Sequence, residues 1–337
     1  TGSISGSGVM ASGGTAQIEA ASIRVGSNGR LSATGALQAS ALTGDLLIDG
    51  GIVDANTISL TVTNGAIRTG SDGLILAQSA LVANARTIGF DGGIAQAQTI
   101  SIAADNLSNA GGLVNALGSA NISISDYLDN DDGEIFGNAL LVRAGRLTNA
   151  NGVIGNTGTG LLDIESANAL DNSNGVISGN GAVRLVGNSL LNDGGLIAAN
   201  GALDILSANS LSNLAGQIAA DGNIDIDAAS IGNDGGSVDG LSSVTIRTGN
   251  LANGNGAVIA RGGTGLDVGG GSHGALTFNN GADGLIGSSD NLTIDAANIT
   301  NAGTIVGSHT LITATPLTNT GLVQGTDLTL NAPTFTN

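Results

Sequence analysis

The sequence contains no cysteine, no tryptophan and no lysine, and its aromatic residues are one tyrosine and four phenylalanines. Without cysteine the chain has no disulfide framework and no thiolate metal site. So few aromatic side chains exclude a wide globular core, because buried aromatics normally contribute much of the area in such a core. The interior must therefore be narrow and built from Ile, Leu, Val and Ala.

Positive charge is also scarce, since all nine basic residues are arginines and the net charge is −18. A strongly acidic chain is repelled by nucleic acid and by anionic membrane surfaces, so we expect neither as a partner. No apolar run approaches the ~18–20 residues that span a bilayer, so we expect no membrane insertion of this segment. No residue pattern predicts a cofactor.

What the chain does contain is glycine, 57 residues of it, and 41% hydrophobic residues, which oppose disorder. These residues form a repeat. A loose version occupies residues 1–106, where Gly50-Gly51-Ile52 returns 42 places later as Gly92-Gly93-Ile94. In residues 107–337 the repeat is explicit, as apolar–x–Asn–x–x–Gly with Ile or Val at the seventh place after the start. It starts at Leu107, Leu128, Leu147, Leu170, Leu190, Leu211, Ile231 and Leu251, and degraded copies start at Phe278, Ile299, Leu317 and Phe335.

Apolar residues alternate within each unit, as Leu203 and Ile205 do, which is the period of a strand and not of a helix. A leucine-rich repeat needs a denser leucine run than this chain has. We therefore predict an all-β, right-handed parallel β-helix of about 16 coils of ~20 residues, with two or three short strands in each coil. We expect one continuous rod over residues 1–106 and 107–337, and a fragment of a longer protein.

In such a fold equivalent residues stack one coil above another. The predicted inward column at the seventh place is Val114, Ile135, Ile154, Ile177, Ile197, Ile218, Val238 and Val258. The predicted column of stacked turn amides is Asn109, Asn130, Asn149, Asn172, Asn192, Asn213, Asn233 and Asn253. Asparagine tolerates left-handed turn geometry, and we expect the glycine at the fifth place to have a positive φ.

Units such as LSNLAGQIAADGNIDIDAAS, residues 211–230, resemble the haemagglutinin repeats of the filamentous haemagglutinin family. These are large exoproteins of Gram-negative two-partner secretion, including contact-dependent growth inhibition effectors and filamentous adhesins. The resemblance implies export through an outer-membrane two-partner secretion transporter and a location outside the cell or on its surface. It also implies that other parts of the parent protein contact a target-cell or host receptor. The family's N-terminal secretion motif and C-terminal toxin are absent, so the chain is similar to the rod between them.

Two segments have residue types that bind calcium in other proteins. Residues 129–134, Asp-Asn-Asp-Asp-Gly-Glu, are the densest acidic cluster but lack the spacing of an EF-hand loop, which favours a solvated turn. Residues 262–267 resemble half of a calcium-binding nonapeptide repeat, but a single copy cannot share an ion between neighbouring turns. We therefore expect no metal site.

The region from Arg261 to Asn280, where the spacing stretches to 27 residues, is the segment we expect to leave the rod as a loop; residues 156–160 are a smaller case. His273 and His309 are the only histidines, and their spacing supplies no convergent partners. The carboxylates Asp225 with Asp227, and Asp163 with Glu165, could pair on one strand face as glycosidase carboxylates do, but a solvated face is the better explanation.

These observations leave two classes of function. The first is a structural rod segment of a large secreted cell-surface exoprotein, which extends a distal receptor-binding or toxin module from the cell for toxin delivery or adhesion. A variant is an adhesin whose rod surface itself binds host glycan or protein. The second is a carbohydrate-active β-helix enzyme, which would need aromatic platforms and clustered acids with basic residues. The sequence supplies neither, so we expect no enzymatic activity and no catalytic residue.

Overall fold

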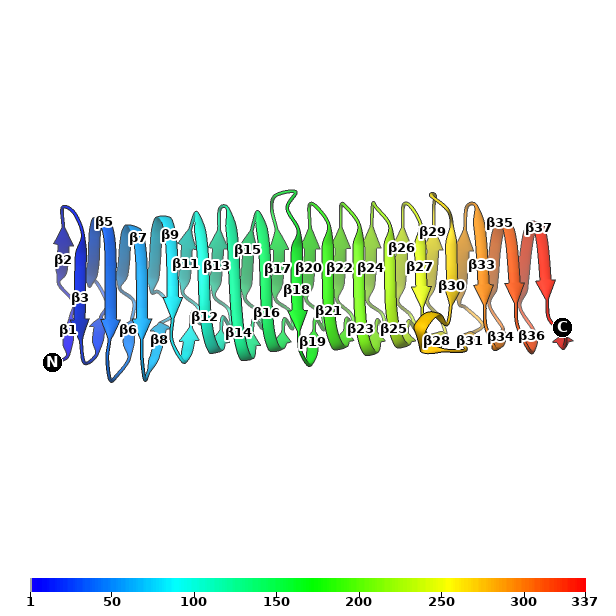
Figure 1. Cartoon of the computed structure of the whole chain (residues 1–337), viewed down its shortest axis with the longest axis horizontal. Coiled ribbons are helices and arrows are strands. Elements are labelled where there is room, and N and C mark those ends of the chain that lie inside the picture. Colours follow the sequence, from blue (N-terminus) through cyan, green and yellow to red (C-terminus); the bar gives the residue numbers. More distant parts are fainter. Residues whose placement is uncertain (1) are drawn as a thin grey trace. The chain divides into compact units, whose positions relative to one another are not determined.

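The computed structural model describes residues 2–337, which fall in two compact units, one ending at Ala167 and the other beginning at Asn168. Both units are built from the turn of a parallel β-solenoid, about 16 turns in all with ~21 residues per turn, as predicted (Figure 1). The helix of the described residues is one short 3₁₀ segment, η1 (Gly271–His273). No helix within residues 2–337 is long and apolar enough to cross a membrane.

Each turn contributes three strand segments, and equivalent segments pair in parallel to give three sheets, named here faces A, B and C. In the turn that begins at Leu107, face A holds residues 106–108, face B holds β13 (Leu113–Ala116) and face C holds residues 119–124. The repeat asparagine lies between faces A and B. The turns before and after residue 107 in the first unit share this plan, so the change in repeat regularity there is not a change of fold.

In the first unit several strands bend through a corner and contribute to two faces. Face A contains β1 (Ile4–Gly6), β4 (Ile23–Val25), β6 (Leu46–Ile48), β8 (Ala66–Thr69) and β10 (Thr87–Gly89). Face B contains β2 (Val9–Ser12), β11 (Ile94–Ala97), β13, β15 (Glu134–Gly137) and β17 (Val153–Asn156), and face C contains β3 (Ala16–Ala20) and β18 (Leu162–Ser166). Faces B and C share β5 (Arg30–Ala41), β7 (Ile52–Val62) and β9 (Leu74–Asn84). Faces C and A share β12 (Thr99–Ser108), β14 (Ser119–Asp129) and β16 (Ala139–Thr148).

The second unit repeats the arrangement. Face A contains β19 (Ala169–Asp171), β28 (Asn250–Asn253), β31 (Thr277–Asn280), β34 (Asn298–Asn301), β36 (Leu317–Asn319) and β38 (Phe335–Thr336). Face B contains β20 (Val176–Gly179), β22 (Leu196–Ala199), β24 (Gln217–Ala220), β26 (Ser237–Gly240), β29 (Ala257–Ala260) and β32 (Leu285–Ser288). Face C contains β27 (Val244–Arg247), β30 (Leu266–Gly269) and β33 (Asn291–Asp295). Strands β21 (Val183–Leu191), β23 (Leu203–Ser212) and β25 (Ile224–Gly232) join faces C and A, and β35 (Thr304–Thr313) and β37 (Leu322–Asn331) join faces B and C.

The core consists of columns of aliphatic side chains in register. On face B of the first unit Val114 pairs with Ile135 and Ile135 with Ile154, and on face B of the second unit Ile177 pairs with Ile197. All eight members of the predicted inward column are no more than 1% exposed. Beta-branched side chains suit these positions because they are stiff and pack well on a pleated surface. Each fully buried side chain of this size stabilises the fold by about 1.5–3 kcal/mol.

The conformational role predicted for the repeat glycine is wrong. Positive φ angles occur one place earlier, at the fourth place of the repeat, and the ladder asparagines do not adopt them. The fourth-place residues with positive φ are Gly111, Asp132, Asn151, Asn174, Gly194, Ala215 and Gly235. The fifth-place glycine is required because the backbone of the neighbouring turn lies very close to it. A Cβ on Gly236 would lie 1.9 Å from the carbonyl oxygen of Asn213. A side chain there would push successive turns apart.

Candidate functional site

The most regular polar feature is a ladder of buried asparagine side chains between faces A and B. In the second unit Asn172 Nδ2 donates to Asn192 Oδ1 at 2.7 Å, and the same bond recurs from turn to turn as far as Asn337, at 2.6–2.8 Å. Each amide also donates to the backbone, as Asn213 does to the carbonyl oxygens of Gly216 and Ser237 at 3.3 and 3.2 Å. Buried amides are thereby satisfied within the stack.

A shorter ladder lies in the first unit. Asn109 Nδ2 donates to Asn130 Oδ1 at 2.7 Å, and Asn130 Nδ2 donates to Asn149 Oδ1 at 2.6 Å. All three residues are fully buried. The sequence predicted eight of the asparagines in these two ladders, from Asn109 to Asn253. The stacking of their amides matches the interaction expected for this column.

Sequence reasoning ended the column at Asn253 and missed its continuation. The structure adds four residues to the ladder, which are Asn280, Asn301, Asn319 and Asn337. Their signal was present, because each follows the apolar start of a degraded copy by two places. It was obscured because the glycine follows at six places in the first of these copies and at four in the next two.

A second set of turn contacts uses aspartate one residue after the ladder position. Asp131 Oδ1 accepts the backbone N–H of Ala150 at 2.9 Å, and Asp193 Oδ1 accepts that of Leu214 at 3.0 Å. Asp91 contacts Ala110 in the same way, and Asp234 contacts Gly254. These carboxylates therefore satisfy a backbone donor of the next turn.

The acidic cluster at residues 129–134 belongs to this turn system. Asp129 Oδ1 accepts the backbone N–H of Asp131 at 3.0 Å, and burial raises the pKa of Asp129, with Asp131 and Asp91 adding like-charge repulsion. Within residues 2–337 no three His, Asp or Glu side chains are grouped in a way that would hold a metal ion.

The expected loop between Arg261 and Asn280 is much shorter than predicted. Strand β30 pairs with β27 and β33, and β31 pairs with β28 and β34, so both stay within the solenoid turns. The glycines at 263 and 265 have positive φ angles of 64° and 94° in the turn that precedes β30. Relative to the preceding turn, two residues are added before β30 and five within residues 270–276, called here the additional segment, which includes η1. Leu266 and Val268 keep the inward positions of face C. Residues 156–160 form a similar small turn, in which the Asn156 side chain donates to the Gly160 carbonyl.

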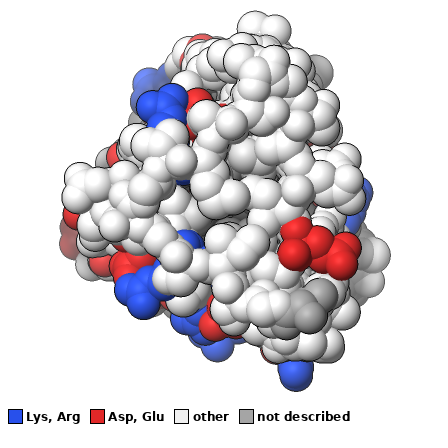
Figure 2. Space-filling model, turned by 90° about the vertical axis from the view of Figure 1, so that its left-hand side faces the viewer, with Lys and Arg blue, Asp and Glu red and all other residues white. Residues whose placement is uncertain are grey.

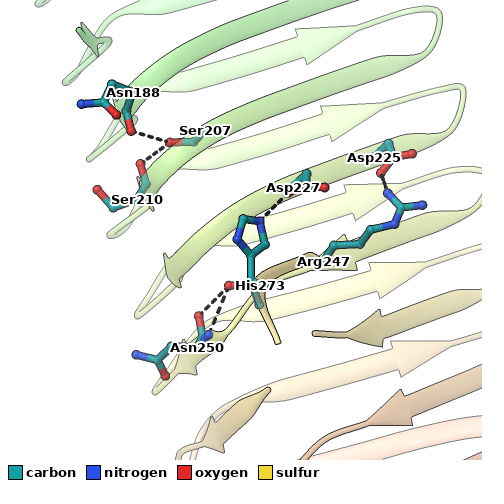
Figure 3. Close-up of polar contacts among 9 residues, drawn as sticks. Asn188, Ser207, Ser210, Asp225, Asp227, Arg247, Asn250 and His273 are labelled. Atoms are coloured by element: carbon teal, nitrogen blue, oxygen red, sulfur yellow. Dashed lines mark hydrogen bonds and ion pairs between the residues drawn. The ribbon is translucent and has the colours of Figure 1, made fainter. Parts of the chain in front are cut away.

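The additional segment folds back over face C and brings His273 to Asp227 on β25 (Figure 3). The His273 Nε2 to Asp227 Oδ1 distance is 2.5 Å, and the two side chains are 18% and 29% exposed. Beside them Arg247 forms an ion pair with Asp225, also drawn in Figure 3. Sequence spacing gave His273 no partner, because the partner lies two turns earlier on another strand.

The two proposed carboxylate pairs are thus parts of ion-pair networks. Asp225 and Asp227 do share the outward side of β25, but each contacts a different side chain, Arg247 for Asp225 and His273 for Asp227. Glu165 of the other pair accepts from Arg143 at 3.0 Å. One strand nearer the N-terminus, burial raises the pKa of Asp204, and the neighbouring Asp225 adds to the effect.

His309 occupies a different position, on the outward side of β35. Its Nδ1 lies 3.6 Å from Asp290 and its Nε2 lies 3.3 Å from Asp327. The side chain is 58% exposed. Ion pairs at such exposure contribute little to stability, about 0–1 kcal/mol.

Arginine pairs with a carboxylate one turn away in several further places, such as Arg30 with Asp54 at 2.8 Å and Arg261 with Asp239 at 2.6 Å. These carboxylates raise the pKa of both arginines. The end view in Figure 2 shows blue and red atoms side by side in several places, separated by uncharged surface. Most arginines are thus paired with a nearby carboxylate, while the 27 acidic residues outnumber the nine arginines.

Face C of the first unit carries two neighbouring depressions. One, of about 530 Å³, crosses β9, β12, β14 and β16. The other, of about 600 Å³, lies further along the same strands and includes Arg86 and Asp105, whose side chains are 3.8 Å apart. Among the residues that line the first depression, Asp163 is the only one that the sequence offered as a candidate functional residue.

No protein-family model matches the chain, and no curated protein and no solved structure matches it. The structure classifies the chain as a parallel β-solenoid with an asparagine ladder.

Proposed function

We propose that the chain is a structural segment of a large secreted cell-surface exoprotein, which extends a distal receptor-binding or toxin module from the cell. The observation that carries the proposal is the asparagine ladder. Its side chains are buried, and their hydrogen bonds run only to the same turn and the next one. These buried asparagines hold successive turns together, and this role does not depend on any one residue of the surface.

This arrangement makes the turn the unit of assembly. Each ladder asparagine from Asn192 to Asn319 accepts a bond from the turn before it and donates one to the turn after it, so the contacts are the same at each of these steps. Solenoids with nearest-neighbour contacts can change in length by whole repeats without a new interface. A spacer requires this property, because its length can be adjusted while its fold is kept.

The proposal takes its biological setting from the resemblance of the repeats to those of the filamentous haemagglutinin family. In that setting the chain is exported unfolded by an outer-membrane two-partner secretion transporter and folds outside the cell. The absence of cysteine and the nearly aromatic-free core suit such export, since no disulfide has to form before or after passage. Stacking of successive turns then opposes backward movement through the pore.

The structural part of the proposal is tested by removing whole turns. Deletion of residues 192–252 joins Leu191 to Asn253 and brings Asn172 next to Asn253 in the ladder. We expect a folded chain whose longest dimension in small-angle scattering falls by about 14 Å, three spacings of ~4.8 Å. Deletion of residues 192–201 is the control, because it removes half a turn and misaligns every column. Equal loss of β structure in both deletions would contradict a modular spacer.

The biological part is tested with the intact parent gene. Cells that carry it are mixed with related cells that lack it, first in contact and then separated by a membrane. Contact-dependent arrest or killing that survives the deletion of residues 192–252 supports a shaft for toxin delivery, and contact-dependent attachment that survives it supports the shaft of an adhesin. Loss of the effect in a deletion variant that is still displayed on the surface would contradict the spacer role.

A further inference from the structure

The outward side of face C in the first unit has a shallow groove lined by small polar and apolar side chains. Thr99 pairs with Ala80, and Ser119 with Ala139, to form one row of the groove. A second row, two residues further along each strand, is Val82, Ser101, Asn121 and Leu141. The volume of about 530 Å³ lies within the range of protein sites for small ligands.

The groove has open hydrogen-bonding capacity. The side chains of Ser101, Ser119 and Asn121 are exposed, and no other side chain or backbone group of the described residues engages them. Two hydroxyls and one carboxamide supply both donors and acceptors along the floor. At one end the side chains of Leu141 and Leu161 form an apolar wall, and Leu161 is 46% exposed.

The lining contains no basic residue and a single carboxylate, Asp163, which follows Leu141 at the end of the second row. The corresponding row of face C in the second unit carries Asp204, Asp225 and Asp267, whereas the groove carries Ser101 and Asn121. In the adjoining depression the two charged residues, Arg86 and Asp105, face each other, and Ser125 also donates to Asp105 at 2.9 Å. An anionic ligand would find no positive charge in the lining, while a neutral ligand would meet little of the surrounding repulsion.

We propose that this groove binds a neutral oligosaccharide. Sugar hydroxyls both donate and accept hydrogen bonds, which matches the serine and asparagine side chains, and sugar C–H faces match Val82, Leu141 and Leu161. The ligand lies across the strands, because both rows run from β9 to β16, about 14 Å at ~4.8 Å per strand. This binding activity is independent of the spacer role.

The test is a binding titration of the full chain by calorimetry with neutral linear trisaccharides of glucose, of galactose and of N-acetylglucosamine. Sialylated and sulfated trisaccharides are titrated in parallel. The groove variant is Ser101→Phe, which fills the centre of the floor from an exposed position and leaves the core untouched. The matched control is Thr293→Phe, in the same row of face C in the second unit.

We expect saturable binding of at least one neutral trisaccharide, a loss of affinity of tenfold or more in Ser101→Phe, and unchanged affinity in Thr293→Phe. Circular dichroism checks that both variants remain folded. The proposal is overturned if no neutral trisaccharide binds, if both variants bind as well as the original chain, or if only the charged trisaccharides bind.

Discussion

Asn109 occupies, one turn later, the position that Phe90 occupies in the first unit, and this pairing sets where the ladder begins. Gly89 pairs with Ser108, so the next residues, Phe90 and Asn109, are stacked. Both are fully buried, and Phe90 offers no side-chain donor. The Oδ1 atom of Asn109 is consequently left without a hydrogen-bond partner. For Asn130 and Asn149 in this unit, the preceding asparagine supplies that donor.

The end of the ladder should tolerate substitution better than its interior. Asn130→Ala removes donors to Asn149 and to the backbone and leaves Asn109 with one bond fewer, at a cost of about 2–4 kcal/mol. Asn109→Ala also removes an acceptor that is already unsatisfied, so we expect it to cost about 1 kcal/mol less. Urea unfolding of the two variants measures the difference. A larger loss for Asn109→Ala would show that the ladder does not distribute stability in this way.

Two adjacent glycines are predicted to be needed for different reasons. Gly235 has a φ of 69°, and a Cβ there would make only ordinary contacts, the nearest 3.8 Å from Ala215 N, so Gly235→Ala should cost about 1 kcal/mol of left-handed strain. Gly236→Ala places a methyl group 1.9 Å from the Asn213 carbonyl oxygen and should cost 3 kcal/mol or more, roughly the upper end for overpacking. Thermal unfolding of both variants measures the two losses of stability. Equal losses would mean that turn spacing is softer than the structure implies.

Ala215 has a φ of 53°, at the place where glycine or asparagine stands in other turns. Replacement by glycine relieves left-handed strain of about 1–2 kcal/mol in the folded state. Glycine also increases the chain entropy of the unfolded state, and this effect cancels about half of the gain in stability. We therefore expect Ala215→Gly to raise the free energy of unfolding by about 0.5 kcal/mol. Ala219→Gly, within β24, is the control and should lower it. The idea fails if Ala215→Gly is destabilising.

His273 is predicted to hold the additional segment of residues 270–276 against face C. His273→Ala removes the contact with Asp227, while the position of this single contact at the surface limits the loss of global stability to roughly 1 kcal/mol. We expect faster cleavage between residues 270 and 276 in limited proteolysis, with a nearly unchanged melting temperature. His309→Ala is the matched control, since it removes a histidine whose contacts, with Asp290 and Asp327, lie outside residues 270–276. Unchanged cleavage in His273→Ala would show that the segment is held by its backbone alone.

Asp204 is predicted to destabilise the fold at neutral pH. Burial raises its pKa in the folded state above the ordinary value of 3.8, so the folded protein holds this proton more tightly than the unfolded chain does. Stability from this group is therefore lost as pH rises from 3.8 through the folded pKa, and the full cost is present at pH 7. Asp204→Asn should raise the melting temperature at pH 7, with a gain that vanishes below pH 3.8. Asp221→Asn, at an exposed turn, is the control; a lower melting temperature for Asp204→Asn at pH 7 would refute the assignment.

The sequence by itself determined the period, the strand alternation and the inward columns, because stacking of identical turns writes the same residue types at a fixed spacing. Leu203 with Ile205, and Ile197 with Ile218, are readable for this reason. The asparagine column was readable too, until the glycine that marked each copy moved to the sixth place after Phe278 and to the fourth place after Ile299 and Leu317. Composition also excluded a disulfide framework and a wide aromatic core.

Only the tertiary structure decided what each turn residue is for. The place of Gly236 against the Asn213 carbonyl depends on the separation of two turns, and local sequence gives no measure of that distance. The contact of His273 with Asp227 joins residues two turns apart, so no spacing rule could assign it. The groove at Ser101 and Asn121 likewise depends on rows formed by four different turns. In a solenoid the repeat fixes what is shared by every turn, whereas surface sites arise from differences between neighbouring turns, which become visible only when the turns are stacked.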